Sequence, residues 1–176
     1  EEERGNMEFW MNLKVYNEKG QLVKEVMKRD PLTNQTAAFI MMLILPGAGD
    51  TYTIDEGGNS RTFRRGSTET IRYHGPTRIW IGTGTATTPA YTDYKLEAPL
   101  QAVTASQPSL SIVGNRMNIS LSATFSFNAQ YTISEVGLDT LLNYGNSANT
   151  AYFLLAHDRL SQSITVYPGW SLTVTY

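Results

Sequence analysis

The chain has 176 residues and no cysteine, so it forms no disulfide or thiolate metal site, and its length predicts one domain spanning residues 1–176. With 14 basic and 16 acidic side chains, it lacks the basic surplus that nucleic-acid binders use to neutralise phosphates, which argues against a nucleic-acid partner. The longest apolar run, residues 37–45, is about half the length of a membrane span, so none is expected.

The first predicted element is a β-hairpin. Apolar and polar residues alternate from Met11 to Tyr16, the turn-forming residues 17–20 follow, and residues 21–27 return as the second strand.

Residues 1–16 are interpreted as an N-terminal arm or strand, in which a charged start precedes the apolar residues Met7, Phe9, Trp10 and Met11. Such a strand pairs at a sheet edge of its own domain or contacts a neighbouring subunit, because exposed edges invite intermolecular pairing. In the second case the two aromatic side chains are the expected anchors. These four residues are therefore the candidate assembly interface, and an intramolecular edge strand is the alternative.

One helix is predicted. Residues 36–45, TAAFIMMLIL, do not alternate and end at Pro46-Gly47, while alanine and methionine favour a helix over a strand. Because this short segment is continuously apolar, we expect its helix to be buried on most sides or covered by a partner.

The remaining sequence consists of short β-type runs separated by Gly, Pro, Asn and Ser. The longest alternation, Met117–Phe127, places six apolar residues on one face and predicts one long strand with that face in the core. The fold class is all-β: a single antiparallel β-sandwich or jelly-roll-like domain with one short buried helix. The predicted later runs are 51–55, 61–64, 68–73, 78–81, 100–104, 110–113, 117–127, 131–136, 150–156, 163–167 and 170–176.

Charge is sparse in the second half of the chain. Only Arg116, Glu135 and Asp139 are charged between residues 100 and 156, where Ser, Thr and Asn supply the polarity. This composition favours close packing against a partner, because neighbouring subunits would not repel each other. A β-domain with polar Thr and Ser faces is the alternative explanation.

The sequence predicts no catalytic residue, metal or cofactor. The two histidines, His74 and His157, are not accompanied by a Gly-x-Ser-x-Gly nucleophile motif. The segment 81–89, IGTGTATTP, lacks the third glycine of a dinucleotide-binding loop and leads into proline, so a strand followed by a turn explains it better. Acidic residues at 50, 55 and 56 do not follow a calcium-loop spacing.

Two glycosylation sequons are present, Asn34-Gln-Thr36 and Asn118-Ile-Ser120. Asn118 is the better candidate, since the alternation places it on the outer face of its predicted strand.

The order of these segments resembles a module of phage and archaeal-virus structural proteins that also occurs in uncharacterised archaeal proteins. The likeness covers nearly the whole chain and brings no catalytic residues. It is carried by the hairpin at 13–24, the helix at Phe39, and the segments 81–89, 93–96, 118–127, 133–138, 154–158, 164–166 and 168–176.

The resemblance implies a virion, tail or turret component. We therefore expect a non-enzymatic structural protein on a virion or extracellular surface, whose partners are copies of itself or other virion proteins. One alternative is a secreted archaeal pilin-like subunit that forms filaments by strand donation. The start at Glu1 fits either removal of a leader peptide, which favours this alternative, or a trimmed chain. Another is a monomeric carbohydrate-binding domain that uses Trp10, Trp80 or Trp170 as a stacking platform.

Overall fold

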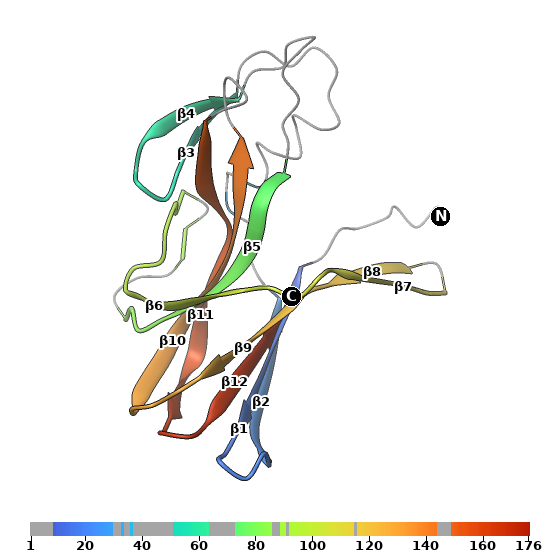
Figure 1. Cartoon of the computed structure of the whole chain (residues 1–176), viewed down its shortest axis with the longest axis vertical. Helices are drawn as coiled ribbons and strands as arrows, with labels where there is room; N and C mark the ends of the chain where they lie inside the picture. The colour runs from blue at the N-terminus through green and yellow to red at the C-terminus, as the bar shows by residue number, and fades with distance from the viewer. Residues whose placement is uncertain are drawn as a thin grey trace.

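The computed structural model is a sandwich of two four-stranded antiparallel sheets, accompanied by two smaller hairpins (Figure 1). Sheet A has the strand order β2-β1-β12-β9 and sheet B the order β11-β10-β5-β6. The predicted all-β antiparallel sandwich is thus confirmed.

The structure describes residues 9–29, 33, 36, 51–63, 73–85, 89–90, 92–114, 116–143 and 149–176. The strands are β1 (Trp10–Tyr16), β2 (Leu22–Arg29), β3 (Thr51–Ile54), β4 (Ser60–Phe63), β5 (Tyr73–Gly82), β6 (Pro99–Thr104), β7 (Ser109–Val113), β8 (Arg116–Ser120), β9 (Ser122–Ser126), β10 (Tyr131–Asn143), β11 (Thr150–Val166) and β12 (Ser171–Thr175).

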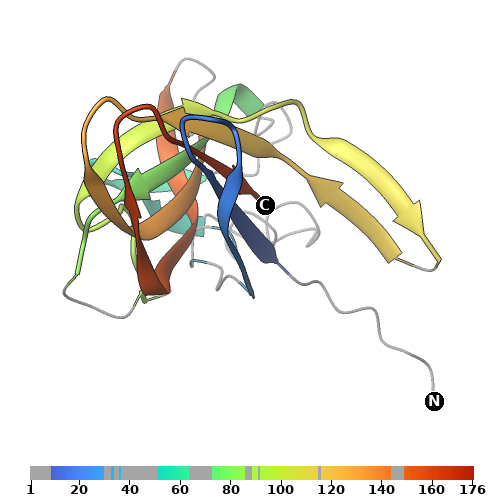
Figure 2. The same ribbon diagram turned by 90° about the horizontal axis from the view of Figure 1, so that it is seen from below.

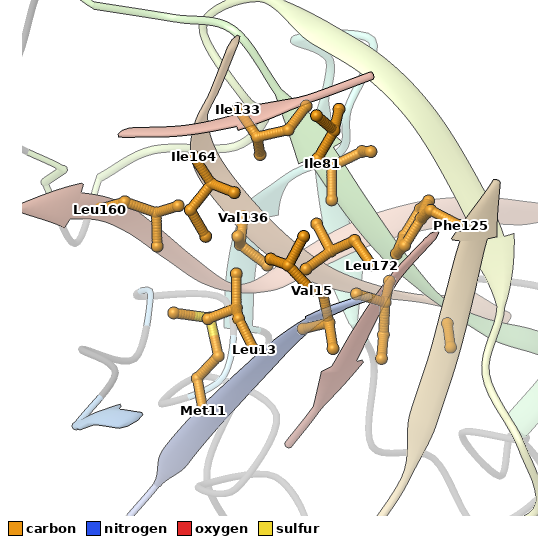
Figure 3. Close-up of a cluster of buried hydrophobic side chains, with 14 of the residues drawn as sticks. Met11, Leu13, Val15, Ile81, Phe125, Ile133, Val136, Leu160, Ile164 and Leu172 are labelled. Carbon is orange, nitrogen blue, oxygen red and sulfur yellow. The ribbon is translucent and has the colours of Figure 1, made fainter. Parts of the chain in front are cut away.

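The core lies between the two sheets and is built from alternate residues of their strands, as period-two patterning requires. Leu13 of β1 and Leu172 of β12 enter it from sheet A, and Ile81 of β5 and Val136 of β10 enter it from sheet B. Figure 3 shows these side chains meeting in one cluster together with Phe125.

The predicted N-terminal hairpin is present, but its first strand is not at a sheet edge. β1 pairs with β2 on one side and with β12 on the other, in a register that places Asn12 opposite Thr175. The intramolecular edge strand, which was the alternative interpretation of this segment, is therefore wrong, because β1 lies inside sheet A. β2 pairs with β1 on one side, as predicted. The strand on the other side is β12, which is distant in the sequence.

The predicted long strand 117–127 is divided at Leu121. Its second part, β9, places Ala123 and Phe125 in the core, whereas Met117 and Ile119 of β8 are 65% and 63% exposed. The expectation of one core face is wrong for β8. An alternating pattern identifies an apolar face, but it does not show whether anything covers that face.

The helix expected at 36–45 lies outside the described residues apart from Thr36. This threonine is buried, and its hydroxyl donates to the Leu155 carbonyl at 2.5 Å. In the described part of the chain, no helix is long and apolar enough to cross a membrane.

Candidate functional site

Among the described residues, the most exposed apolar feature is the hairpin formed by β7 and β8. It projects from the sandwich on its own, as two views at right angles show (Figures 1 and 2). Its register pairs Leu110 with Ile119 and Ile112 with Met117, so these four side chains share one face. They are 62%, 63%, 70% and 65% exposed in that order, so little in the described part of the chain covers them. We call this set the hairpin apolar face.

The opposite face of the hairpin carries mainly Ser and Asn side chains, including Ser111 and Asn118, and the only charged residue between 109 and 120 is Arg116. The hairpin is thus amphipathic and almost uncharged. Apolar surface that is contiguous and exposed commonly marks a protein interaction site. The hairpin apolar face is therefore the candidate assembly surface.

The four N-terminal residues proposed as an interface are placed differently from one another. Met7 lies outside the described residues, Phe9 is partly buried and Trp10 is 49% exposed. Met11 is fully buried in the core of its own chain, so its side chain is committed to folding. Trp10 begins β1 at the end of sheet A from which β8 departs, because Leu121 pairs there with Tyr176. An interface role for Phe9 and Trp10 stays a prediction.

A buried cluster of charged side chains lies on the outer face of sheet B, facing away from the core. His157 Nε2 lies 3.0 Å from Glu135 Oε2, and His157 Nδ1 lies 2.8 Å from Asp93 Oδ2. The Glu135 carboxylate also accepts main-chain N–H bonds from Gly84 at 3.0 Å, Glu97 at 3.0 Å and Ala98 at 2.7 Å. We call this the histidine cluster.

Hydrogen bonds outweigh burial in setting the charge state of this cluster. Burial acts to raise the pKa of Glu135, but bonds from His157 and the three main-chain donors lower the pKa below its ordinary value. Burial likewise acts to lower the pKa of His157, yet bonds to Glu135 and Asp93 raise it. The cluster therefore favours an ionised Glu135 and a charged imidazolium.

The glycines of the IGTGTATTP segment are explained by this cluster. A Cβ atom on Gly84 would lie 2.7 Å from Glu135 Oε1 and also 2.7 Å from Glu97 Cβ, and Gly82 faces the same carboxylate. Both positions therefore need glycine because the backbone approaches Glu135 closely. The predicted end of the strand is confirmed, since β5 ends at Gly82, and residues 86–88 of the turn predicted after it lie outside the described residues.

A second charged cluster lies further along β10 on the same outer face. Asp139 is fully buried and accepts bonds from Arg78 Nε at 3.0 Å and from Trp80 Nε1 at 2.6 Å. Arg78 also reaches Glu56 at 3.2 Å and stacks on Tyr152, with its Cζ 3.3 Å from the ring centroid. We call this the arginine cluster.

The pKa of Glu56, in the arginine cluster, lies far above its ordinary value. Burial and the neighbouring Asp139 carboxylate raise the pKa of Glu56 to about 9, and Arg78 opposes this shift only in part. Burial and the Asp139 carboxylate therefore favour the protonated form of Glu56.

Both clusters hold covering segments against sheet B. The histidine cluster binds Gly84, Glu97 and Ala98 through their main-chain N–H groups, and the arginine cluster binds the turn that follows β3. Both ring nitrogens of His157 face carboxylates and its side chain is 7% exposed, so it is poorly placed to take a proton from a substrate. The sequence did not predict these clusters, although charged Glu135 and Asp139 within an apolar strand were a signal.

Other candidate residues are accounted for separately. Asp55, considered for calcium, accepts bonds from Asn59 N at 2.9 Å and Arg61 Nε at 2.5 Å, while Asp50 lies outside the described residues. No three His, Asp or Glu side chains within the described ranges are grouped to hold a metal. The side chain of His74 lies outside the description, as does Asn34.

The remaining sequence candidates are dispersed. Asn118 is exposed, as its sequon would require, and glycosylation there stays a prediction. Trp80 belongs to the arginine cluster, whereas Trp170 packs edge-on against Tyr167 with ring centroids 4.9 Å apart. These two tryptophans therefore belong to different parts of the sandwich rather than to one stacking platform.

Comparisons with protein-family models, curated proteins and solved structures found no match to this chain. The resemblance to viral structural modules therefore stays a prediction.

Proposed function

We propose that this chain is a non-enzymatic structural subunit that associates with copies of itself through the hairpin apolar face, as part of a virion shell, turret or tail. The observation that supports this proposal is the exposure of Leu110, Ile112, Met117 and Ile119 on one side of a projecting, nearly uncharged hairpin. The buried charged clusters are saturated by their own neighbours, which is consistent with a structural role.

The size of the hairpin apolar face indicates how strong one contact can be. Fully burying one such side chain contributes about 1.5–3 kcal/mol. Two copies meeting through this face would bury eight side chains, each about two-thirds exposed, for a gross gain on the order of 10 kcal/mol. Association itself costs about 4–15 kcal/mol. A single contact is therefore weak, and stable assembly requires several contacts per subunit, as in a shell or filament.

The test compares two hairpin variants by sedimentation velocity across a range of concentrations. Ile112→Thr/Ile119→Thr keeps β-forming residues but removes apolar surface, whereas Ser109→Thr/Ser111→Thr alters the opposite face. We expect the native chain and the serine variant to form concentration-dependent oligomers and the isoleucine variant to remain monomeric. Circular dichroism establishes that each variant is folded.

A native chain that stays monomeric at every concentration would refute the proposal, as would an isoleucine variant that assembles like the native chain. Negative-stain electron microscopy then distinguishes the two settings, since a virion component forms closed or tail-like particles and a pilin-like subunit forms threads.

A further inference from the structure

β8 has one edge that its pairing with β7 leaves open. Leu121 exchanges two main-chain hydrogen bonds with Tyr176, each 2.9 Å, so its N–H and C=O point toward β12. The main-chain carbonyl of Ser122 points the opposite way, because it accepts a bond from Ser106 N at 2.7 Å. Main-chain direction alternates along a strand, so Ile119 and Met117 direct their polar groups to the same side as Leu121.

The open edge of β8 is therefore on the side on which Leu121 pairs with Tyr176. In the described part of the chain, β8 is paired with β7 alone, and the open edge carries the N–H and C=O groups of Met117 and Ile119. An edge of this kind is a template for an added strand.

We propose that β8 pairs antiparallel with β8 of a second copy, about a two-fold axis that passes beside Asn118. This inference rests on the proposed function, because it adds an edge contact through which the same hairpins meet. It joins the two hairpins into one four-stranded sheet by main-chain hydrogen bonds, and the hairpin apolar faces of both copies then lie side by side on one surface of that sheet.

The register follows from which groups point outward. Centring the pair on Asn118 places Met117 opposite the partner's Ile119 as a hydrogen-bonded pair, and Ile119 opposite the partner's Met117. All five residues of β8 are then matched, from Arg116 to Ser120. The apolar side chains of both copies fall on the same face, where cross-strand pairs of large apolar residues stabilise a sheet.

Charge also favours a second copy as the occupant. In this register Arg116 lies opposite the partner's Ser120, and the two arginines are at opposite ends of the pairing. The hairpin contains no other charged residue, so two copies meet without like-charge contact. A two-fold contact of this type is self-complementary, as the commonest homodimer interfaces are.

The absence of cysteine from the chain makes the register directly testable. At the two-fold axis, Asn118 and the partner's Asn118 form a non-hydrogen-bonded pair with Cα atoms about 4.5 Å apart. This spacing suits a disulfide, which needs a Cα separation of about 4.4–6.8 Å. Two Ser120 residues would lie four positions apart, or roughly 13 Å, which no disulfide spans.

The experiment compares Asn118→Cys with the matched control Ser120→Cys, both oxidised mildly and run on non-reducing gels. We expect most of the Asn118→Cys chain to run at twice the monomer mass of 19.6 kDa and the Ser120→Cys chain to remain monomeric. Sedimentation of the reduced proteins reports assembly independently. If Asn118→Cys does not assemble, an oxidised mixture of Met117→Cys and Ile119→Cys chains replaces it and should form the mixed dimer selectively.

The outcomes separate the two proposals. Assembly of the reduced proteins without selective cross-linking overturns the strand pairing and leaves the proposed function standing, as would be seen if another protein or another segment of this chain covers β8. Equal cross-linking of Asn118→Cys and Ser120→Cys also overturns the register. Native and control chains that are monomeric throughout overturn both proposals.

Discussion

Glu135 and His157 are joined diagonally across β10 and β11. The strand register places Glu135 opposite Arg159 and His157 opposite Gly137, yet Glu135 Oε2 lies 3.0 Å from His157 Nε2. Gly137 has no side chain between them, and Leu96 packs over it. The bond therefore connects two adjacent strands and, through the carboxylate, links them to the main chain at Gly84, Glu97 and Ala98.

The histidine cluster should make the free energy of unfolding greatest in mildly acidic solution. The pKa of Glu135 is lowered by folding, so its contribution is present above its ordinary value of 4.5 and lost as pH falls through the folded value. The pKa of His157 is raised, so its contribution is present below 6.5 and lost as pH rises through the folded value. Both contributions are complete between pH 4.5 and 6.5.

Urea unfolding of the native chain and of His157→Gln, from within this pH range to well above pH 6.5, measures the effect. The difference in stability between them should decrease as pH rises above 6.5, because the native imidazolium is then lost. A difference that does not change with pH would contradict a charged His157.

Glu56 should make the stability of the folded chain depend on pH, and the substitution Glu56→Gln should remove this contribution. Its pKa rises from 4.5 to about 9 on folding, so the folded chain retains a proton that the unfolded chain releases. Stability from this group therefore falls as pH rises between these two values. In Glu56→Gln, which mimics the protonated acid, thermal unfolding midpoints should fall less steeply over this interval. Identical slopes in both chains would show that Glu56 is ionised in the folded state.

Two positions of one alternating run should differ sharply in their contribution to stability. Phe125→Ala removes a ring that is 0% exposed in the core and should cost about 3–5 kcal/mol in the free energy of unfolding. Met117→Ala removes a side chain that is 65% exposed and should change it by no more than about 0.5 kcal/mol in the monomer. Denaturant titration at low protein concentration measures both, and a large loss at Met117 would place β8 in a core.

Gly84→Ala should destabilise the chain by about 1–3 kcal/mol, because the added methyl group meets the Glu135 carboxylate and Glu97. Thr85→Ala is the matched control, since the neighbouring Thr85 is exposed. Chemical denaturation of both variants tests this expectation. An unchanged Gly84→Ala midpoint would mean that the backbone does not approach Glu135 this closely.

Local patterns predicted those elements whose determinants are neighbours in the sequence. The β1–β2 hairpin follows from strict alternation and from a turn in which Asn17 Oδ1 accepts N–H bonds from Lys19 and Gln21, while Gly20 adopts a φ of 73°. The sandwich class likewise follows from the spacing of short strands.

The charged clusters could not be predicted in the same way. Asp93, Glu135 and His157 come from three separate segments, and only the completed sheet brings them together. Nothing near His157 in the sequence indicates its two carboxylate partners. The exposure of Met117 was missed for a related reason, since alternation gives no information on what lies above a face.

The pairing of β1 with β12 has a consequence for how the chain folds as it is synthesised. β1 emerges early, yet one of its two neighbours emerges only after β11 has been made, so sheet A stays incomplete until then. During that interval, the apolar side of β1 lacks Leu172 and Val174 as packing partners. Contacts between such distant segments slow folding and prolong the exposure of apolar strands to aggregation. Ribosome-bound chains that stop before Ser171 should accordingly remain sensitive to protease in β1, and protection should appear only when β12 has left the exit tunnel.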